Sequence, residues 1–513
     1  MRAKELSCLL VALLTWSARG QTNAAKIHSI SLRDCISQAL QHNLDVQIVR
    51  RDPDIARFKL GAARGTQYDP IFTFGAERRY VDVPANFDLK KVNPYNPYTE
   101  TEDVFGGGLS GRLTPGLSYR LFASSTAVSA FTDFTGLPVP KTGLPVPNRF
   151  TNNYEAMLTL NLKQSLLKDF WIDAGRLAIQ VNKKNLKISE QELRLQIMKT
   201  VLAVQTAYFD LDYAGRIVQV MQKGLELAEE LLAGDRQRIE IGRLPPLSER
   251  QAESEVETAR ASLLTAQDAL DTRRDALLNL MSDDLAGSGK EILVPADTLD
   301  VRWEKPSLTE SLLHAMTLRP DLLLAKLEVE KQGIVVRYQY NQMFPALDLE
   351  GSYGGLSVEA ASQAATFSDL GNRLHPTYTA GVVLKIPLSN TAARNQYKAS
   401  KEIKEQTLLN LKKVEQNVYL QVLDVVKSLE RHQQRMNATR KARAYAESAF
   451  EAEKQKLLDG RSTSFLVSEY ENRLIAAQAA EILALVDYNK AEAQLAFNDG
   501  TTLKKNQITL DLR

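Results

Sequence analysis

The sequence has few cysteines and few histidines. Among its 513 residues there are two cysteines and five histidines, and the histidines are scattered without the spacing of a metal-ligand set. Two cysteines cannot form a disulfide framework or a structural zinc site. These scarcities argue against a metalloenzyme or a thiol enzyme, and we expect no cofactor and no metal. No Ser/His/Asp, paired-carboxylate or phosphate-loop arrangement stands out either, so the chain is predicted not to be an enzyme.

Long apolar runs are also missing. No run reaches the roughly 18 residues that a membrane-spanning helix needs. Apolar residues make up 44% of the chain and charged residues 25%. That balance is neither that of a disordered protein nor that of a polytopic helical membrane protein.

The first 20 residues have the three-part pattern of a secretory signal peptide. Arg2 and Lys4 form a basic start, an apolar core covers 9–16, and small residues at 18 and 20 precede the expected cleavage site. The alternative is an N-terminus that is apolar by chance. Removing 1–20 takes the formal net charge from +2 to 0, so a mature chain offers no electrostatic case for binding nucleic acid.

The sequence repeats itself. Residues 31–40 align with 307–316 at a shift of 276, and 174–176 align with 392–394 at a shift of 218. The second shift also carries Gly242-Arg243 onto Gly460-Arg461. We therefore predict a tandem duplication, with repeats at 31–282 and 307–499, a linker at 283–306 and a tail at 500–513. The difference between the two shifts gives the first copy 58 additional residues.

Each copy is predicted to run helix, strands, long helix, glycine tip, helix. The short helices are expected at 32–67, 247–281, 308–343 and 465–497, and the long ones at 176–241 and 392–459. Each long helix would measure roughly 100 Å, which matches two short helices stacked end to end. Heptad spacing in the long helices predicts coiled-coil packing. The repeating positions are Ile197, Val204, Leu211, Val218, Leu225, Leu232 and Ile239 in the first copy, and Val422, Leu429, Met436, Phe450 and Leu457 in the second.

Four segments alternate with the period of a strand, at 71–80, 154–162, 346–353 and 378–384. Two more, at 109–113 and 117–123, flank Thr114-Pro115-Gly116. Strands of this kind with short turns at one end and long loops at the other are typical of an outer-membrane barrel, and a soluble sandwich is the alternative. Four or six strands cannot close a barrel alone, so the chain is expected to close it with copies of itself.

In this arrangement the sequence resembles the TolC-like outer-membrane efflux protein family, as a divergent branch. The resemblance covers nearly the whole mature chain. It rests on the paired openings at Ser31 and Ser307 and on the helix-ending Pro70 and Pro345. It also rests on a strand-to-helix exit at Pro387-Leu388-Ser389-Asn390 with Arg394, and on glycines at the two predicted tips.

The resemblance implies a mixed α/β membrane protein that forms a homotrimer. A transmembrane antiparallel β-barrel of four or six strands per subunit would lie in the outer-membrane lipid, and coiled-coil hairpins would form an α-barrel in the periplasm. Such a trimer would be the passive exit duct of a tripartite efflux pump or a type I secretion system. A periplasmic adaptor would link it to an inner-membrane transporter. The alternative is a non-channel periplasmic coiled-coil adaptor or structural protein.

The resemblance also implies where the adaptor docks. The expected docking residues are Gly242, Arg243 and Leu244 at the first tip, and Gly460, Arg461, Ser462 and Thr463 at the second. Structural turns with no partner are the alternative, because glycine is common at helix C-termini. Family members tend to have an acidic residue six positions after the second glycine, where this chain has Leu466. Glu469 is therefore the expected acid of the tunnel entrance, and no gating network is assigned.

Overall fold

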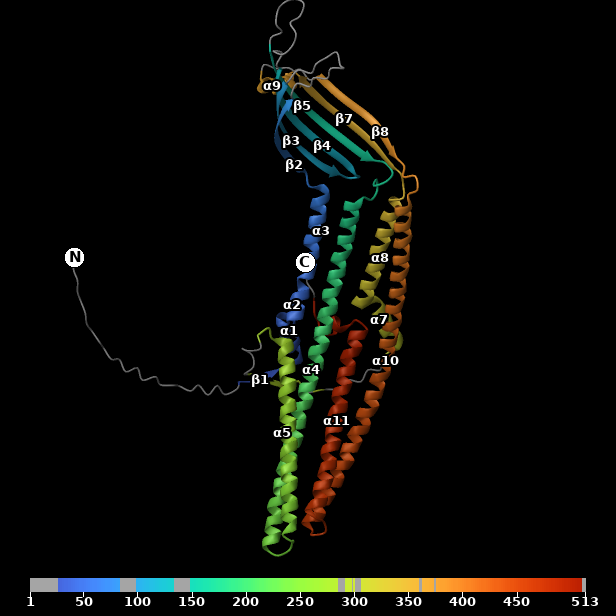
Figure 1. The fold of residues 1–513 in the computed structure, drawn as a ribbon. Coiled ribbons are helices and arrows are strands. Elements are labelled where there is room, and N and C mark those ends of the chain that lie inside the picture. The colour runs from blue at the N-terminus through green and yellow to red at the C-terminus, as the bar shows by residue number, and fades with distance from the viewer. Residues whose placement is uncertain are drawn as a thin grey trace, which may run out of the picture. The chain divides into compact units, whose positions relative to one another are not determined.

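The computed structural model describes residues 26–83, 98–132, 148–284, 291–297, 299, 306–358, 362–372 and 375–509 (Figure 1). The predicted signal peptide lies outside these residues. The chain forms two compact units. We call them the sheet unit (48–196 and 309–422) and the tip unit (up to 47, 197–308 and 423–509). The two long helices, α4 (Ala174–Glu240) and α10 (Thr391–Leu458), contribute to both.

Two helical hairpins make up most of the tip unit. Helix α5 (Leu247–Met281) runs alongside the C-terminal half of α4, and α11 (Ser464–Asn498) alongside that of α10 (Figure 1). The bounds of all four helices agree with the predicted ones to within two residues. The heptad positions are turned inward, and those that are fully buried are Ile197, Val204, Leu211, Leu225, Val422, Leu429, Met436, Phe450 and Leu457.

The hairpins are held by apolar side chains near their tips. Leu225 of α4 packs with Val256 and Leu263 of α5. In the second hairpin, Phe450 and Leu457 pack with Val467, and Leu227 and Leu231 of α4 join that cluster, among others. The first hairpin therefore contributes to the core of the second, and the two tips lie next to each other.

A small parallel sheet completes the tip unit together with α1 (Leu32–His42) and α12 (Thr502–Lys505). Strand β1 (Lys26–Ile30) pairs with β6 (Glu291–Pro295), which lies inside the stretch expected as a linker. The hydroxyl of Tyr208 on α4 lies 3.2 Å from the carbonyl oxygen of Ile30 and 3.1 Å from Oδ2 of Asp297. Sequence reasoning missed this pairing because two five-residue strands far apart in the chain have no periodicity long enough to detect.

The sheet unit contains six antiparallel strands in the order β2-β3-β4-β5-β7-β8. Their bounds are β2 Ile71–Val83, β3 Tyr98–Leu113, β4 Leu117–Thr132, β5 Arg149–Ser165, β7 Ala346–Val358 and β8 His375–Lys385. The segments 109–113 and 117–123 lie within β3 and β4, which are much longer than predicted. Helix α9 (Gln363–Asn372), which was not predicted, packs against β5 and β7.

The helices at 32–67 and 308–343 were predicted as continuous, and this was wrong. The first is divided into α1, α2 (Leu44–Arg50) and α3 (Asp52–Tyr68), and the second into α7 (Leu308–Leu318) and α8 (Pro320–Asn341). Asn43 is extended, and its side-chain oxygen accepts a hydrogen bond from the Val46 N–H. Arg319 is also extended because the ring of the following Pro320 disfavours the helical conformation.

Arg176, at the start of α4, holds the β3–β4 turn against the adjoining chain. Its guanidinium donates hydrogen bonds to the carbonyl oxygens of Pro115 (3.1 Å), Asp169 (2.6 Å) and Phe170 (2.7 Å). Its Nε lies 3.2 Å from a carboxylate oxygen of Asp173, and its side chain is only 12% exposed. One cation therefore pairs with three carbonyls and a buried carboxylate at the end of the sheet.

Replacing Arg176 by alanine is expected to destabilise the protein by about 3 kcal/mol, because several acceptors lose their donor together. Thermal unfolding of detergent-solubilised protein measures the change. Arg394→Ala is the matched control, since Arg394 occupies the aligned position of the second repeat and is exposed. Equal melting temperatures for the two variants would contradict a structural role for Arg176.

Candidate functional site

Both predicted tips are glycine turns of the same geometry. Gly242 and Gly460 each have φ of +72°, in the left-handed region that glycine adopts without strain. At the first tip the N–H of Arg243 donates to the carbonyl of Arg238 (2.8 Å), and that of Gly242 to Ile239 (2.9 Å). Arg461 and Gly460 repeat the pattern with Lys456 (2.8 Å) and Leu457 (3.1 Å). Each long helix thus ends in a Schellman motif.

The arginine after each glycine is exposed. Among the residues that the structure describes, neither the Arg243 nor the Arg461 side chain has a hydrogen bond or an ion pair. The turn itself uses only the backbone N–H of these residues, which any amino acid except proline supplies. The fold therefore gives no local reason for arginine at both positions.

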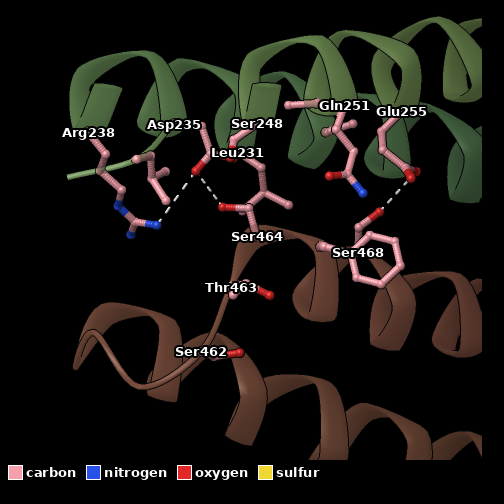
Figure 2. Close-up of a pocket in the computed structure, with 14 residues that line it drawn as sticks. Leu231, Asp235, Arg238, Ser248, Gln251, Glu255, Ser462, Thr463, Ser464 and Ser468 are labelled. Carbon is pink, nitrogen blue, oxygen red and sulfur yellow. Dashed lines mark hydrogen bonds and ion pairs between the residues drawn. The ribbon is translucent and has the colours of Figure 1, made fainter. Parts of the chain in front are cut away.

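A cavity of about 300 Å³ lies between the two tips (Figure 2). Asp235 of α4 is 3% exposed and accepts a hydrogen bond from the Ser464 hydroxyl (2.5 Å), with a guanidinium nitrogen of Arg238 3.6 Å away. One helical turn along α11, the Ser468 hydroxyl donates to Glu255 of α5 (3.2 Å). Two serines of α11 thus bridge to carboxylates of the first hairpin, and the cavity has a mixed lining in which Phe465 and Leu244 lie among the polar side chains.

The second tip is fixed by its own polar side chains. Thr463 caps α11, and its hydroxyl accepts from the Leu466 N–H (3.4 Å). The Ser462 hydroxyl donates to Glu453 (2.5 Å), which also pairs with Lys456 (2.8 Å). Hydrogen bonds from Lys456 and Ser462 lower the pKa of the Glu453 carboxyl from its usual value.

The predicted site residues fall into two groups. Leu244, Ser462 and Thr463 line the cavity. Gly242, Arg243, Gly460 and Arg461 form the turns outside it. Glu469 pairs with Arg473 one turn along α11 (3.0 Å) and does not line the cavity. Its assignment as an entrance acid stays a prediction.

Sequence reasoning missed the acids that face the second hairpin. Asp235 and Glu255 lie within long helices rich in charged residues, where a carboxylate usually faces solvent. The only available signal was the serine pair Ser464 and Ser468, spaced one helical turn apart on α11.

A further acid, Glu471, lies on α11 about one helical turn after Ser468 and is buried, with 9% of its surface exposed. Burial raises the pKa of its carboxyl to about 8; Glu255 raises it further, and Lys454 opposes the shift. Glu471 faces a hollow beside Gly224 of α4. The protonated form of this side chain is therefore favoured at neutral pH.

The described residues hold no group of His, Cys, Asp and Glu suited to a metal ion. None of the described helices has an apolar stretch long enough to cross a membrane.

The fold is that of known outer-membrane channels. The CmeC outer membrane channel of Campylobacter jejuni aligns with a TM-score of 0.64 at 14% identity, covering 98% of this chain and 94% of that one. The open-state MtrE outer membrane channel of Neisseria gonorrhoeae aligns with a TM-score of 0.64 at 17% identity, covering 92% of this chain and 89% of that one. A membrane protein from Pseudomonas aeruginosa aligns with a TM-score of 0.65 at 16% identity, covering 95% of this chain and 93% of that one.

Comparison of the sequence with known families identifies the family of this chain. The Outer membrane efflux protein model matches residues 110–282 and 313–501, and the chain belongs to this family. Outer membrane efflux protein BepC of Brucella suis biovar 1 is 24% identical over 332 residues, 63% of this chain and 68% of that protein. Fusaric acid resistance protein FusA of Burkholderia cepacia is 24% identical over 202 residues, 39% of this chain and 35% of that protein. The TolC-like resemblance is thereby confirmed, and family membership indicates the outer membrane as the location.

Proposed function

We propose that the chain is the outer-membrane exit duct of an export machine, built as a ring of three copies. The observation that carries this proposal is the open six-stranded sheet, which has one apolar and one polar face in the half nearest the β3–β4 turn. One cross-strand row consists of Phe72, Leu109, Leu121, Leu160, Tyr353 and Tyr378. The adjacent row, on the opposite face, consists of Ile71, Ser110, Arg120, Asn161, Ser352 and Thr379. An apolar outside and a polar inside are what a membrane barrel needs.

The edges of the sheet support closure by other copies. Within the described part of the chain, β2 and β8 each have a neighbour on one side only. An unpaired strand edge is not tolerated in lipid, so the edges must pair with something. Pairing β8 of one copy with β2 of the next repeats head to tail and closes into a ring. Three copies with six strands each give an eighteen-stranded barrel.

The helices next to those two edges carry exposed apolar side chains. Ile55 and Phe58 of α3, which leads into β2, are 47% and 75% exposed. Ile403 and Leu409 of α10, which follows β8, are 47% and 67% exposed. Contact between these two patches in neighbouring copies would remove them from water. The same head-to-tail arrangement therefore accounts for both the strand edges and the helix surfaces.

In this duct the tips of α4–α5 and α10–α11 face the periplasm and dock a periplasmic adaptor, through which an inner-membrane transporter delivers its cargo. The names of BepC and FusA favour efflux of small molecules over secretion of proteins. The competing role, a periplasmic coiled-coil adaptor, leaves the apolar face of the sheet without a function.

The test is fractionation followed by electrophoresis of unheated samples. We expect the chain in the outer-membrane fraction and a trimer that becomes a monomer on heating. A stable monomer in detergent, or a chain recovered from the soluble periplasm, would contradict the proposal.

Phe58→Asp combined with Leu409→Asp is expected to weaken trimer association about tenfold, because each copy would bring two carboxylates into an apolar contact. Sedimentation in detergent measures the trimer-to-monomer ratio. Lys59→Asp, at the neighbouring exposed position of α3, is the control and should leave that ratio unchanged. An unchanged ratio in the double variant would place the subunit contact elsewhere.

A further inference from the structure

The polar face of the sheet carries a concentration of cations near the β3–β4 turn. Two successive cross-strand rows lie there. The first contains Arg112, Ser118, Lys163 and Glu350, and the second contains Ser110, Arg120, Asn161, Ser352 and Thr379. Arg112 and Arg120 are diagonal neighbours on adjacent strands, so two like charges lie close together.

The acids of this region are already paired. Nζ of Lys163 lies 2.8 Å from Asp348 and 3.0 Å from Glu350. Arg112 and Arg120 are exposed, and within the described residues neither has an ion pair. The guanidinium of Arg120 lies over the ring of Phe122, 4.9 Å from its centroid. The local charge is therefore positive, and two guanidinium groups have their donors free.

The surroundings of Arg120 are rich in hydrogen-bond donors. A shallow hollow in the sheet is lined, among others, by Ser118, Arg120, Asn161, Lys163 and Thr379. Hydroxyl, amide, ammonium and guanidinium groups are the groups that bind carboxylate and phosphate oxygens. The one carboxylate in the hollow, Glu350, is bonded to Lys163.

We propose that Arg112 and Arg120 form an oxyanion-binding ring inside the duct, repeated in each subunit, which favours passage of solutes carrying carboxylate or phosphate groups. This inference rests on the proposed duct, with the polar face turned inward. At the far end of the same face acids outnumber cations: Glu77, Glu100, Glu102 and Glu155 lie there with Arg79 and Arg149. The cation excess is confined to the turn end.

Both arginines come from the additional 58 residues of the first repeat. The ring is therefore a property of this chain's added hairpin and would be absent from a subunit with four strands. The hairpin widens the barrel and at the same time supplies its positive lining.

The test is single-channel recording of the purified full-length trimer in bilayers of neutral phosphatidylcholine, with inorganic tripolyphosphate added to the aqueous phase as the probe. Neutral lipid ensures that any block comes from the soluble anion. Wild-type channels should be blocked by tripolyphosphate. Arg112→Gln with Arg120→Gln should raise the half-blocking concentration at least tenfold and move the reversal potential in a KCl gradient toward that of a cation-preferring pore.

Arg78→Gln is the matched control. Arg78 lies on the opposite face of the sheet, paired with Asp103, so this variant should keep the block and the reversal potential of the wild type. Conducting channels whose block is the same with and without the two arginines overturn the oxyanion ring and leave the duct standing. A wild-type trimer that inserts and never conducts overturns the duct, and the ring with it.

Discussion

Charge reversal at both tips, Arg243→Glu with Arg461→Glu, is expected to abolish export while the trimer forms and reaches the outer membrane. The turns are made by backbone hydrogen bonds and by Gly242 and Gly460, so the fold has no need of either arginine side chain. A cation at a helix C-terminus contributes under about 1 kcal/mol, too little to unfold the tip when it is lost. An exposed charge repeated at both tips is suited to recognising a charged partner, and reversal would turn attraction into repulsion.

Two measurements are needed on the same cells. Export is scored by resistance to a toxic substrate of the pump, and assembly by the unheated trimer band. Arg243→Lys with Arg461→Lys keeps both charges and serves as the control, with export close to that of the wild type. If the glutamate variant exports normally, the tips are turns with no role in docking.

Glu471→Gln is expected to stabilise the protein at alkaline pH, by up to about 5 kcal/mol, and to have little effect at pH 4.5. The Glu471 pKa is raised from 4.5 to about 8 in the folded protein, so its contribution to stability is fully present below pH 4.5. That contribution is lost as the pH rises from 4.5 to about 8, because the carboxyl of the unfolded chain ionises over this range while the buried carboxyl stays protonated. Glutamine has the same shape and no proton to lose.

The groups around Glu471 come from three helices. Lys454 lies on α10, Glu255 on α5, and Lys223, Glu226 and Glu230 on α4 beside the same hollow. Thermal unfolding in detergent across pH 4.5 to 9 should show a falling melting temperature for the wild type and a flatter profile for the variant. Glu469→Gln, two residues earlier and half-exposed, should follow the wild type. Parallel profiles for Glu471→Gln and the wild type would show that this carboxyl ionises freely.

The sequence alone was sufficient to predict where the long helices begin and end. A heptad row such as Ile197, Val204 and Leu211 is a local pattern, and glycine at 242 and 460 marks the helix end through its own backbone freedom. Because the sequence is duplicated, the helix and tip predicted in one copy supported those predicted at the aligned positions of the other. Where the sequence misled, the cause was also local: the capping side chain of Asn43 and the ring of Pro320 each interrupt a helix whose apolar spacing continues across the break.

The strands were predicted less completely because only part of each alternates. The outer parts of β3, β4 and β5 are polar or small on both faces, so residues such as Thr99, Ser129 and Asn152 give no period-two signal. Pairing with the neighbouring strand extends them, since each backbone group finds its partner across the sheet. Helix α9 and the β1–β6 pair likewise depend on packing against segments distant in the sequence.

The candidate site shows the same division. The sequence located both tips, because a turn of this kind is encoded by a few consecutive residues. It did not show that Asp235 would be buried opposite Ser464, or that Glu471 would lose contact with water. Those environments arise only when the hairpins α4–α5 and α10–α11 pack together, and burial of a polar side chain is decided by the neighbours that the tertiary structure brings to it.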